Sequence, residues 1–356
     1  MTFPTPRFVP ASAARAALAL ALGIVSGILA YRVGLPLPWM LGPMIGATVA
    51  SILGAPIAAP NPLRPIVIPV IGVMLGSGVT PEILGVLGDW AISFLVLPPF
   101  LIVAAGASFL FYRVIGRYDP VTAYFSAMPG GLNEMLILGA EQGGDEKRIA
   151  LAHASRILLV IGFVALFFGL ILGVTSGGQT GAVWTGAWDL APRDYVILAL
   201  CAVAGVWAGR LLRLPAAAVL GPMLLSGVAH FFHVVEVPPP SVLVIAAQVV
   251  MGTVIGCRFI GATVREVGHD LFLGIFSTIG MLITGIGFAW LVSALTATDL
   301  SQAFLAYSPG GLTEMSLLAF AMGGDIAYVS ITHIVRIVLV IFAAPLVFRW
   351  FGGSEG

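Results

Sequence analysis

A seven-residue motif that contains potential binding groups occurs twice in the chain. Pro129–Met135 reads Pro-Gly-Gly-Leu-Asn-Glu-Met, and Pro309–Met315 reads Pro-Gly-Gly-Leu-Thr-Glu-Met. Proline lacks an N–H and glycine adopts backbone angles that other residues avoid, so each copy predicts a helix break followed by a new short helix. The free N–H groups at the start of such a helix attract anions. The two breaks are either a substrate or coupling-ion site or a pair of structural hairpin tips. We favour the binding site because the motif is duplicated.

A His-x-x-Arg sequence follows each motif, as His153 with Arg156 and as His333 with Arg336. Residues three apart share one face of a helix. A charge at membrane depth costs about 2.5–3.5 kcal/mol even on insertion scales. We therefore predict one Glu–Arg ion pair in each copy, which either pins the break to the next helix or opens for a substrate carboxylate or a proton. The histidines are candidates for a proton relay or for hydrogen bonds that pack helices. The candidate substrate- or ion-binding residues are Pro129, Gly130, Gly131, Asn133, Glu134, Arg156, Pro309, Gly310, Gly311, Thr313, Glu314 and Arg336.

The composition excludes a water-soluble globular enzyme. Of the 356 residues, 59% are hydrophobic and 9% are charged, whereas soluble domains have about 25% charged residues. The 16 Lys and Arg residues balance the 16 Asp and Glu residues, which gives no nucleic-acid footprint. The two cysteines, Cys201 and Cys257, lie in apolar runs and predict neither a disulfide framework nor a cysteine metal site.

Apolar stretches of about 18–25 residues, the length of a membrane-spanning helix, recur along the whole chain. We predict an all-α polytopic membrane protein with about ten spans and two shorter broken segments, near 119–142 and 299–322. If the broken segments also cross the membrane, the number of spans becomes twelve. The predicted spans lie near residues 14–33, 37–54, 63–79, 90–115, 148–173, 193–212, 215–233, 241–257, 268–296 and 328–350.

The two halves of the chain repeat each other at an offset of about 180 residues, which indicates an internal duplication. We predict a first membrane repeat over residues 1–175, a linker over 176–190 and a second repeat over 191–356. The Gly-x-x-x-Gly spacings within the repeats predict closely packed helices. Asp145 and Asp325 each follow two glycines and are predicted helix N-caps. Further repeated segments are Leu41–Met44 with Leu220–Met223, Gly72–Gly76 with Gly252–Gly256, and Gly143–Asp145 with Gly323–Asp325.

The distribution of basic residues predicts that the repeats are inverted. Lys and Arg near helix ends favour the cytoplasmic side. With the N-terminus inside and five spans per half, twelve basic residues are cytoplasmic and only Arg32 and Arg193 are outside; with six spans per half the division is seven to seven. Five is an odd number, so the halves insert in opposite directions. Inverted repeats with Gly/Pro-interrupted segments at matching positions are typical of secondary transporters.

The duplicated Leu-Gly-Pro-Met and Pro-Gly-Gly-Leu-(Asn/Thr)-Glu-Met elements, each with Gly-Gly-Asp and His-x-x-Arg, resemble the AbrB family of bacterial membrane proteins. The resemblance extends from about residue 15 to residue 350. Members of that family are labelled either as regulators of an adaptive-response gene or as ammonia monooxygenases, and they differ from the soluble DNA-binding regulator of the same name. The resemblance therefore implies a membrane regulator or sensor of gene expression as an alternative function, and a monooxygenase as a weaker one.

The residues themselves favour transport. Five histidines without a cluster of His, Asp or Cys do not make a convincing copper site, so we expect no enzymatic activity and no cofactor or metal. We expect a secondary transporter of a small solute, such as an organic anion, coupled to protons or Na⁺. It would lie in the bacterial inner membrane with a cytoplasmic N-terminus. Its expected partners are the lipid bilayer and the solute or ion, with a homo-oligomer as a further expectation and no nucleic acid.

Overall fold

The computed structural model describes residues 10–171 and 185–352, except residues 36, 80, 82, 215, 262 and 263. Within these residues every regular element is a helix, as predicted. The predicted linker lies outside the described residues up to position 184. The elements are α1 (Pro10–Val33), α2 (Pro38–Ile52), η1 (Asn61–Leu63), α3 (Arg64–Gly76), α4 (Ile83–Val114), α5 (Pro120–Ala127), α6 (Leu132–Glu141), α7 (Glu146–Ile171), α8 (Pro192–Leu211), α9 (Ala217–Phe231), α10 (Ser241–Gly256), η2 (Cys257–Phe259), α11 (Val264–Leu295), α12 (Leu300–Tyr307), α13 (Leu312–Ala321) and α14 (Ile326–Gly352).

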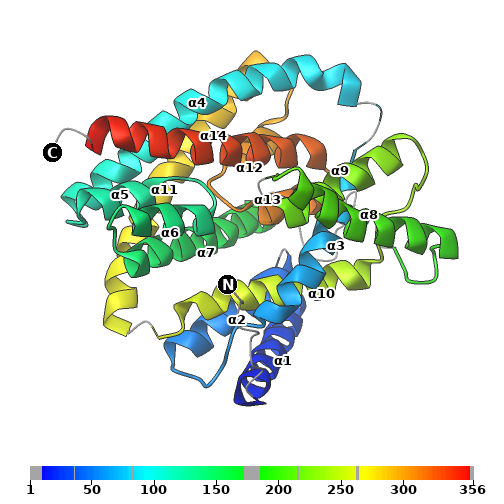
Figure 1. Ribbon diagram of the computed structural model, residues 1–356, viewed down its shortest axis with the longest axis horizontal. Helices are drawn as coiled ribbons and strands as arrows, with labels where there is room; N and C mark the ends of the chain where they lie inside the picture. Colours follow the sequence, from blue (N-terminus) through cyan, green and yellow to red (C-terminus); the bar gives the residue numbers. More distant parts are fainter. Residues whose placement is uncertain are drawn as a thin grey trace.

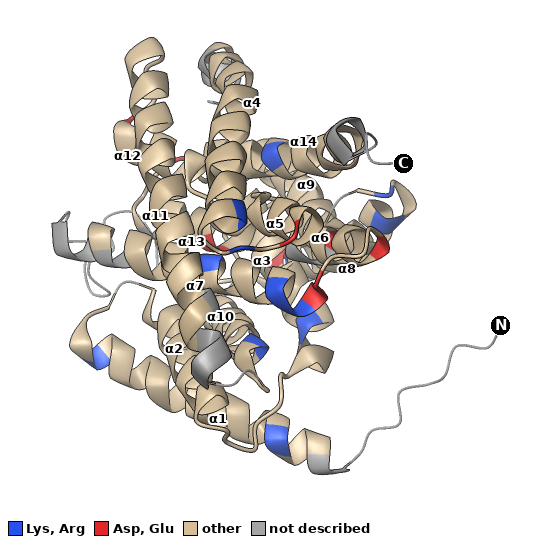
Figure 2. Cartoon of the chain, turned by 90° about the vertical axis from the view of Figure 1, so that its left-hand side faces the viewer, with Lys and Arg blue, Asp and Glu red and all other residues tan. Residues whose placement is uncertain are grey.

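The helices have the length and surface of a multi-pass membrane protein. Six of them, in α1, α4, α8, α10, α11 and α14, are long and apolar enough to cross a membrane, and three shorter apolar helices accompany them. Large apolar side chains point outward, including Leu95 and Val203, which are 77% and 73% exposed. Such a surface is stable in contact with lipid rather than water. Charged residues are sparse along the helices (Figure 2), and the chain is an all-α polytopic membrane protein.

The helices form two groups that each contain elements from both repeats. In the panel group, α1, α2, α3, α8, α9 and α10 pack on one another; in the core group, α4 to α7 pack with α11 to α14. In Figure 1 the panel group runs from the lower part of the molecule to its right side, and the core group fills the upper left. The hairpins that carry the duplicated motif belong to the core group.

Close glycine contacts give the relative directions of the panel helices. A Cβ placed on Gly72 would lie 2.5 Å from the carbonyl oxygen of Val219, and one on Gly76 would meet that of Met223, so residue numbers rise together along α3 and α9. The predicted close packing at these spacings is confirmed. The repeat-equivalent contacts join α10 to α2 in the same sense, and they are Gly252 with Met40 and Gly256 with Met44.

These directions are the ones expected of inverted repeats. The helices α2 and α3 are shorter than the six long apolar helices; if they cross the membrane one after the other, they run in opposite directions. Since α9 runs parallel to α3, it runs opposite to α2, which is its equivalent in the first repeat. Likewise, α10 runs parallel to α2 and therefore opposite to α3, which is its equivalent in the first repeat. Two homologous halves related in this way are inverted repeats.

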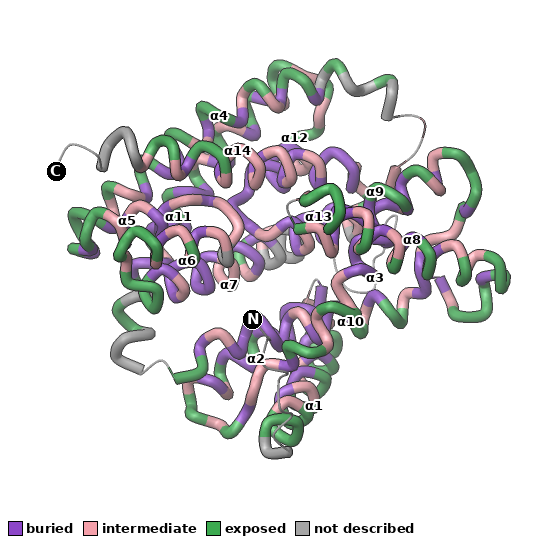
Figure 3. The backbone as a smooth tube through the Cα atoms, viewed as in Figure 1, coloured by how far each residue is buried: buried purple, intermediate pink, exposed green. Residues whose placement is uncertain are grey.

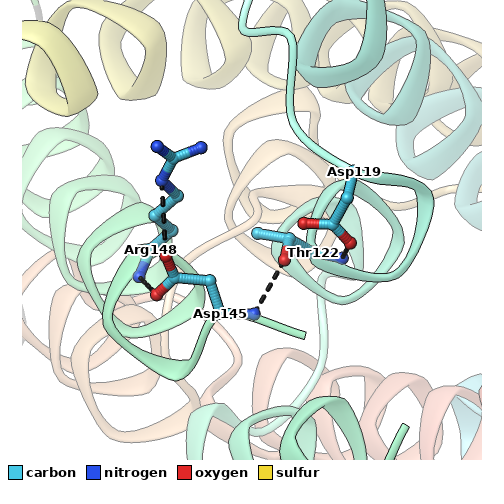
Figure 4. Close-up of polar contacts among 4 residues, drawn as sticks. All are labelled: Asp119, Thr122, Asp145 and Arg148. Atoms are coloured by element: carbon cyan, nitrogen blue, oxygen red, sulfur yellow. Dashed lines mark hydrogen bonds and ion pairs between the residues drawn. The ribbon is translucent and has the colours of Figure 1, made fainter. Parts of the chain in front are cut away.

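The broken segments fold as helical hairpins, the shape expected of re-entrant segments. Hairpin 1 consists of α5, α6 and the tip Met128–Gly131. The backbone N–H of Asp145, just after α6, donates to Thr122 Oγ1 near the start of α5 at 2.8 Å (Figure 4). Both ends of hairpin 1 therefore lie on one side. Hairpin 2, with α12, α13 and the tip Ser308–Gly311, has the same geometry, because a Cβ on Gly324 would lie 3.4 Å from Gln302 Nε2.

Capping groups determine where the hairpin helices start and stop. Asp119 accepts from the N–H of Thr122 at 2.9 Å and starts α5, and Asp299 accepts from the N–H of Ser301 at 2.9 Å and starts α12. At the other end, Gly143 and Gly323 have φ values of +83° and +67°. Only glycine adopts this conformation without strain, and it is the usual way to end a helix.

The structure moves some predicted boundaries. The span predicted near 90–115 begins at Ile83 in α4, and the span predicted near 63–79 ends at Gly76 in α3. The predicted N-caps are confirmed: Asp145 Oδ1 accepts from the N–H of Arg148 at 3.1 Å, and Asp325 Oδ1 accepts from that of Tyr328 at 2.9 Å.

Candidate functional site

The hairpin tips are extended breaks, as the motif predicts. Met128 and Ser308 each precede a proline, which disfavours helical angles, and their ψ values are 124° and 136°. The helices resume after Gly131 and Gly311, which are also extended. None of the four tip glycines has a positive φ. The expectation that they supply unusual backbone angles is therefore wrong.

The tip glycines instead provide space for close approach. A Cβ on Gly131 would collide with the Glu134 carboxylate, and one on Gly311 would collide with that of Glu314. Each glutamate is the third residue of its helix and folds back toward the first turn. A carboxylate in that position stabilises the helix N-terminus through its free N–H groups and the helix dipole. The remaining tip glycine of hairpin 1, Gly130, lies against Val340 of α14, where a Cβ would be 2.7 Å from Cγ1.

Arg156 and His153 hold the carbonyl end of α5 in the first repeat. Arg156 Nη1 donates to the carbonyl of Met128 at 3.0 Å, and Nη2 lies 2.8 Å from His153 Nδ1. His153 Nε2 lies 2.8 Å from the carbonyl of Phe125. A carbonyl only accepts, so Nε2 carries the proton and Nδ1 accepts from the arginine. The guanidinium thus faces the negative end of the α5 dipole.

Arg336 and His333 hold α12 in a similar way but with one different bond. Arg336 Nη1 donates to the carbonyl of Ser308, and Nη2 donates to that of Gly310, both at 2.6 Å. His333 Nε2 lies 3.0 Å from the carbonyl of Leu305. Because the second Arg336 bond goes to the tip, His333 Nδ1 has no partner among the residues that the structure describes.

The predicted Glu134–Arg156 and Glu314–Arg336 ion pairs are wrong. The carboxylates cover the starts of α6 and α13, whereas the arginines bind carbonyls before those helices begin. The arginine whose charge acts on Glu314 is Arg258, in η2 of the panel group. Arg258 was not singled out from the sequence. A comparison of the two repeats could have identified it, because the equivalent position in the first repeat is the uncharged Gly78 and the arginine is therefore specific to the second repeat.

Of the other predicted residues, the structure brings the two prolines and four glycines into the tips, but it does not describe the side chain of Asn133. Thr313 is partly buried and its hydroxyl bonds to Glu314. Among the described residues, no three His, Cys, Asp or Glu side chains lie close enough to hold a metal ion. The described side-chain groups near the tips are the two guanidiniums, the Glu134 and Glu314 carboxylates, hydroxyls and the two imidazoles.

The two arginines leave donors free in the middle of the protein. Arg156 and Arg336 are 5% and 3% exposed, and their charges act on each other. Each lies ten residues after the start of its helix; at about 1.5 Å per residue this is about half of a bilayer ~30 Å thick. The Nε atoms of both arginines lack a protein partner, as do the hydroxyls of Ser126 and Ser308. Two buried cations with free donors can bind an anion.

Comparison with known proteins identifies the family of the chain. Residues 39–352 match the model of a family described as "Transition state regulatory protein AbrB". The chain is 26% identical over 353 residues to "Uncharacterized protein YhjN" of Bacillus subtilis (strain 168), with 93% of this chain and 91% of that protein covered. It is 27% identical over 333 residues to "Putative regulator AbrB" of Escherichia coli (strain K12), with 93% and 94% covered. The family model covers most of the chain, including both hairpins, and the protein belongs to the AbrB family.

Proposed function

We propose that this protein is a secondary transporter of a small organic anion. The observation that carries the proposal is the pair Arg156 and Arg336, two buried arginines without a carboxylate partner in the described part of the chain. Each cation in a membrane costs several kcal/mol unless it is neutralised. A carboxylate bound between the hairpin tips would supply the missing negative charge and accept from the free Nε–H groups.

The inverted repeats support transport rather than catalysis. Matching broken segments that meet at mid-depth are the arrangement in which secondary transporters bind their substrates and alternate between two sides. The proposal includes the bacterial inner membrane, a cytoplasmic N-terminus, coupling to protons or Na⁺, and neither enzymatic activity nor a cofactor. A homo-oligomer is compatible with these features.

Uptake by proteoliposomes tests the proposal. The purified full-length protein would be offered radiolabelled acetate, succinate and citrate under inward proton or Na⁺ gradients. We expect saturable uptake of at least one anion. Losing one partner of a buried charge pair costs about 2–5 kcal/mol, so Arg156→Gln and Arg336→Gln should each lower uptake at least about 30-fold.

Arg193→Gln is the matched control. Arg193 also donates to a carbonyl, that of Val234 at 2.8 Å, but this bond is exposed and lies far along the chain from the hairpins. Its loss should leave uptake within about twofold, because exposed polar contacts contribute little. No uptake of any of the three anions, or full uptake by both buried-arginine variants, would contradict the proposal.

A membrane-bound regulator is the second candidate, and the printed name of the Escherichia coli relative favours it. Transcript profiles of a deletion strain separate the two functions. If regulation follows from transport, the Arg336→Gln variant should fail to restore the wild-type profile. Full restoration by this variant, together with absent uptake by wild-type proteoliposomes, would favour direct regulation.

A further inference from the structure

His153 and His333 occupy equivalent positions, but only His333 has a nitrogen without a partner. Both imidazoles are fully buried. In each, Nε2 faces a carbonyl, Phe125 at 2.8 Å or Leu305 at 3.0 Å, and must carry the proton. His153 Nδ1 accepts from Arg156, whereas His333 Nδ1 has no protein partner. The neutral His333 therefore presents a free lone pair at the buried site.

The difference arises from the arginine one helical turn further along. In the first repeat, Arg156 Nη2 turns to the histidine. In the second, Arg336 Nη2 reaches the carbonyl of Gly310 at 2.6 Å and leaves the histidine unbound. A second proton could join His333 without displacing an existing hydrogen bond, whereas on His153 it would have to displace the Arg156 donor.

We propose that His333 Nδ1 binds the proton that is transported together with the anion. A hydronium ion gives its proton to the Nδ1 lone pair: one O–H bond breaks, one N–H bond forms, and water is left. The imidazole becomes an imidazolium with one N–H on each nitrogen. When the anion leaves on the opposite side, the same proton returns to water there. This inference rests on the proposed function and names its coupling ion.

Electrostatics explains why the proton and the anion would bind together. The positive charge of Arg336 opposes a second positive charge on His333. An anion bound at Arg336 removes that opposition, so it raises the affinity of His333 for a proton. By linkage, the proton raises the affinity for the anion by the same factor. Neither binds well alone, which is the requirement for coupled transport.

Several other titratable and charged groups lie on or near α14, but the coupling between proton and anion depends on the charge of Arg336. Of the described groups, Arg336 is the one whose charge acts on His333. Among the described residues, the elements packed against α14 carry Arg64, Tyr112, Arg113, Tyr307 and Glu314. Hairpin 1 and α7 add Tyr124, Glu134, Glu141, Glu146, Lys147, Arg148, His153 and Arg156. Asp299 and Asp325 lie just before α12 and α14, and α14 itself carries Tyr328 and Arg336.

Proteoliposomes and a second buried histidine outside the hairpins provide the test. An inward proton gradient should drive accumulation of acetate, succinate or citrate by wild-type protein and by His230→Gln, because His230 lies in α9 and contacts the carbonyls of Ser226 and Val237. The His333→Gln variant keeps an amide N–H for the carbonyl of Leu305 but cannot take up the proton. It should lose proton-driven accumulation at least tenfold, and the pH dependence of its half-saturating anion concentration should disappear.

Wild-type protein gives a second readout that does not depend on a folded variant. The half-saturating anion concentration should fall by about tenfold for each unit of decreasing pH, as expected when one proton binds with each anion. Saturable uptake that is independent of pH and driven by Na⁺, or proton-driven accumulation retained by His333→Gln, would overturn this inference and leave the proposed function intact. No uptake under either gradient would overturn both.

Discussion

Hairpins 1 and 2 carry nearly the same motif but lie in different surroundings. In hairpin 2 and the helix after it, Glu314 is 5% exposed and Ile326, Ala327 and Tyr328 are all buried. In hairpin 1 and its following helix, Glu134 is only partly buried and residues 146–148 are exposed. Figure 3 shows the same contrast between the buried α13 and the more exposed α6.

The difference follows from the residues that the motif does not include. Ile326-Ala327-Tyr328 in the second repeat corresponds to Glu146-Lys147-Arg148 in the first. Tyr328 bonds to Ser93 of α4 at 2.7 Å inside the core group, whereas Arg148 remains at the surface, 3.4 Å from Asp145 and over the ring of Tyr118. The comparison shows that the duplicated motif specifies the helix break, whereas the residues outside the motif decide whether the hairpin and the helix after it are buried in the protein.

The largest expected effect is a complete block of uptake by a disulfide, and it concerns a contact that is present in only one half of the protein. A Cβ on Gly78 would lie 2.9 Å from Ile326 Cδ1, so α3 and α14 touch on the hairpin 2 side. The equivalent residues, Arg258 and Glu146, carry opposite charges, and Glu146 is exposed here. If the repeats exchange conformations during transport, Glu146 should close onto Arg258.

Paired cysteines test this exchange after replacement of Cys201 and Cys257. Both the Gly78→Cys/Ile326→Cys and the Glu146→Cys/Arg258→Cys variants should form disulfides under oxidation, and each should block uptake until it is reduced. A disulfide in the first variant but never in the second would show that the halves do not exchange conformations.

The next effect is a loss of stability, and it compares how much the contacts beside each hairpin contribute to the free energy of unfolding. Ser93→Ala removes the buried hydrogen bond between Ser93 and the Tyr328 hydroxyl and should lower the free energy of unfolding by about 1–3 kcal/mol. Arg148→Ala removes an exposed pair in the first repeat and should cost about 0–1 kcal/mol. Denaturant unfolding in detergent compares the two variants. Equal losses would mean that the contrast in burial has no energetic counterpart.

A smaller effect should be the same in both repeats. Asp119 and Asp299 each cap their helix by accepting from a first-turn N–H, that of Thr122 or of Ser301, so Asp119→Ala and Asp299→Ala should each cost about 0.5–2 kcal/mol. Asparagine at either position accepts the same bond and serves as the control. A large difference between the two alanine variants would mean that the hairpins differ already at their first turns.

The smallest effect is the pH dependence of the Asp299 cap. The hydrogen bond from Ser301 lowers the pKa of the Asp299 carboxyl below its usual value, despite partial burial. Its contribution to stability is therefore fully present above the unfolded pKa of about 3.9 and is lost as pH falls through the lower folded pKa. The stability difference between wild type and Asp299→Asn should be constant from pH 7 to 5 and change only below about pH 4. A change near neutral pH would contradict this assignment.

Much of the fold could be predicted because its signals are local or repeated. Apolar length predicts the spans, Pro-Gly-Gly predicts the breaks, and Asp145 and Asp325 are recognisable caps because each follows two glycines and opens a helix. The odd number of spans required by the basic residues predicts inverted repeats, in agreement with the directions of α2, α3, α9 and α10.

The site was harder to predict because its partners depend on helix direction and distance. Counting charges pairs Glu134 with Arg156, but the carboxylate stabilises the start of α6 and the guanidinium binds the end of α5. The two helix ends meet at one tip with opposite partial charges, so each side chain finds a backbone partner nearer than the other side chain.

The sequence by itself determined the membrane class, the duplication, the positions of the breaks and the identity of the intramembrane arginines, since these follow from composition, spacing and the cost of charge in lipid. Only the tertiary structure decided that hairpin 1 is less buried than hairpin 2, that the arginines have no carboxylate partner among the described residues, and that there His333 rather than His153 has a free nitrogen. The physical reason is that hydrogen bonds act over about 3 Å. The partner of a buried polar atom is therefore decided by packing between segments far apart in the chain.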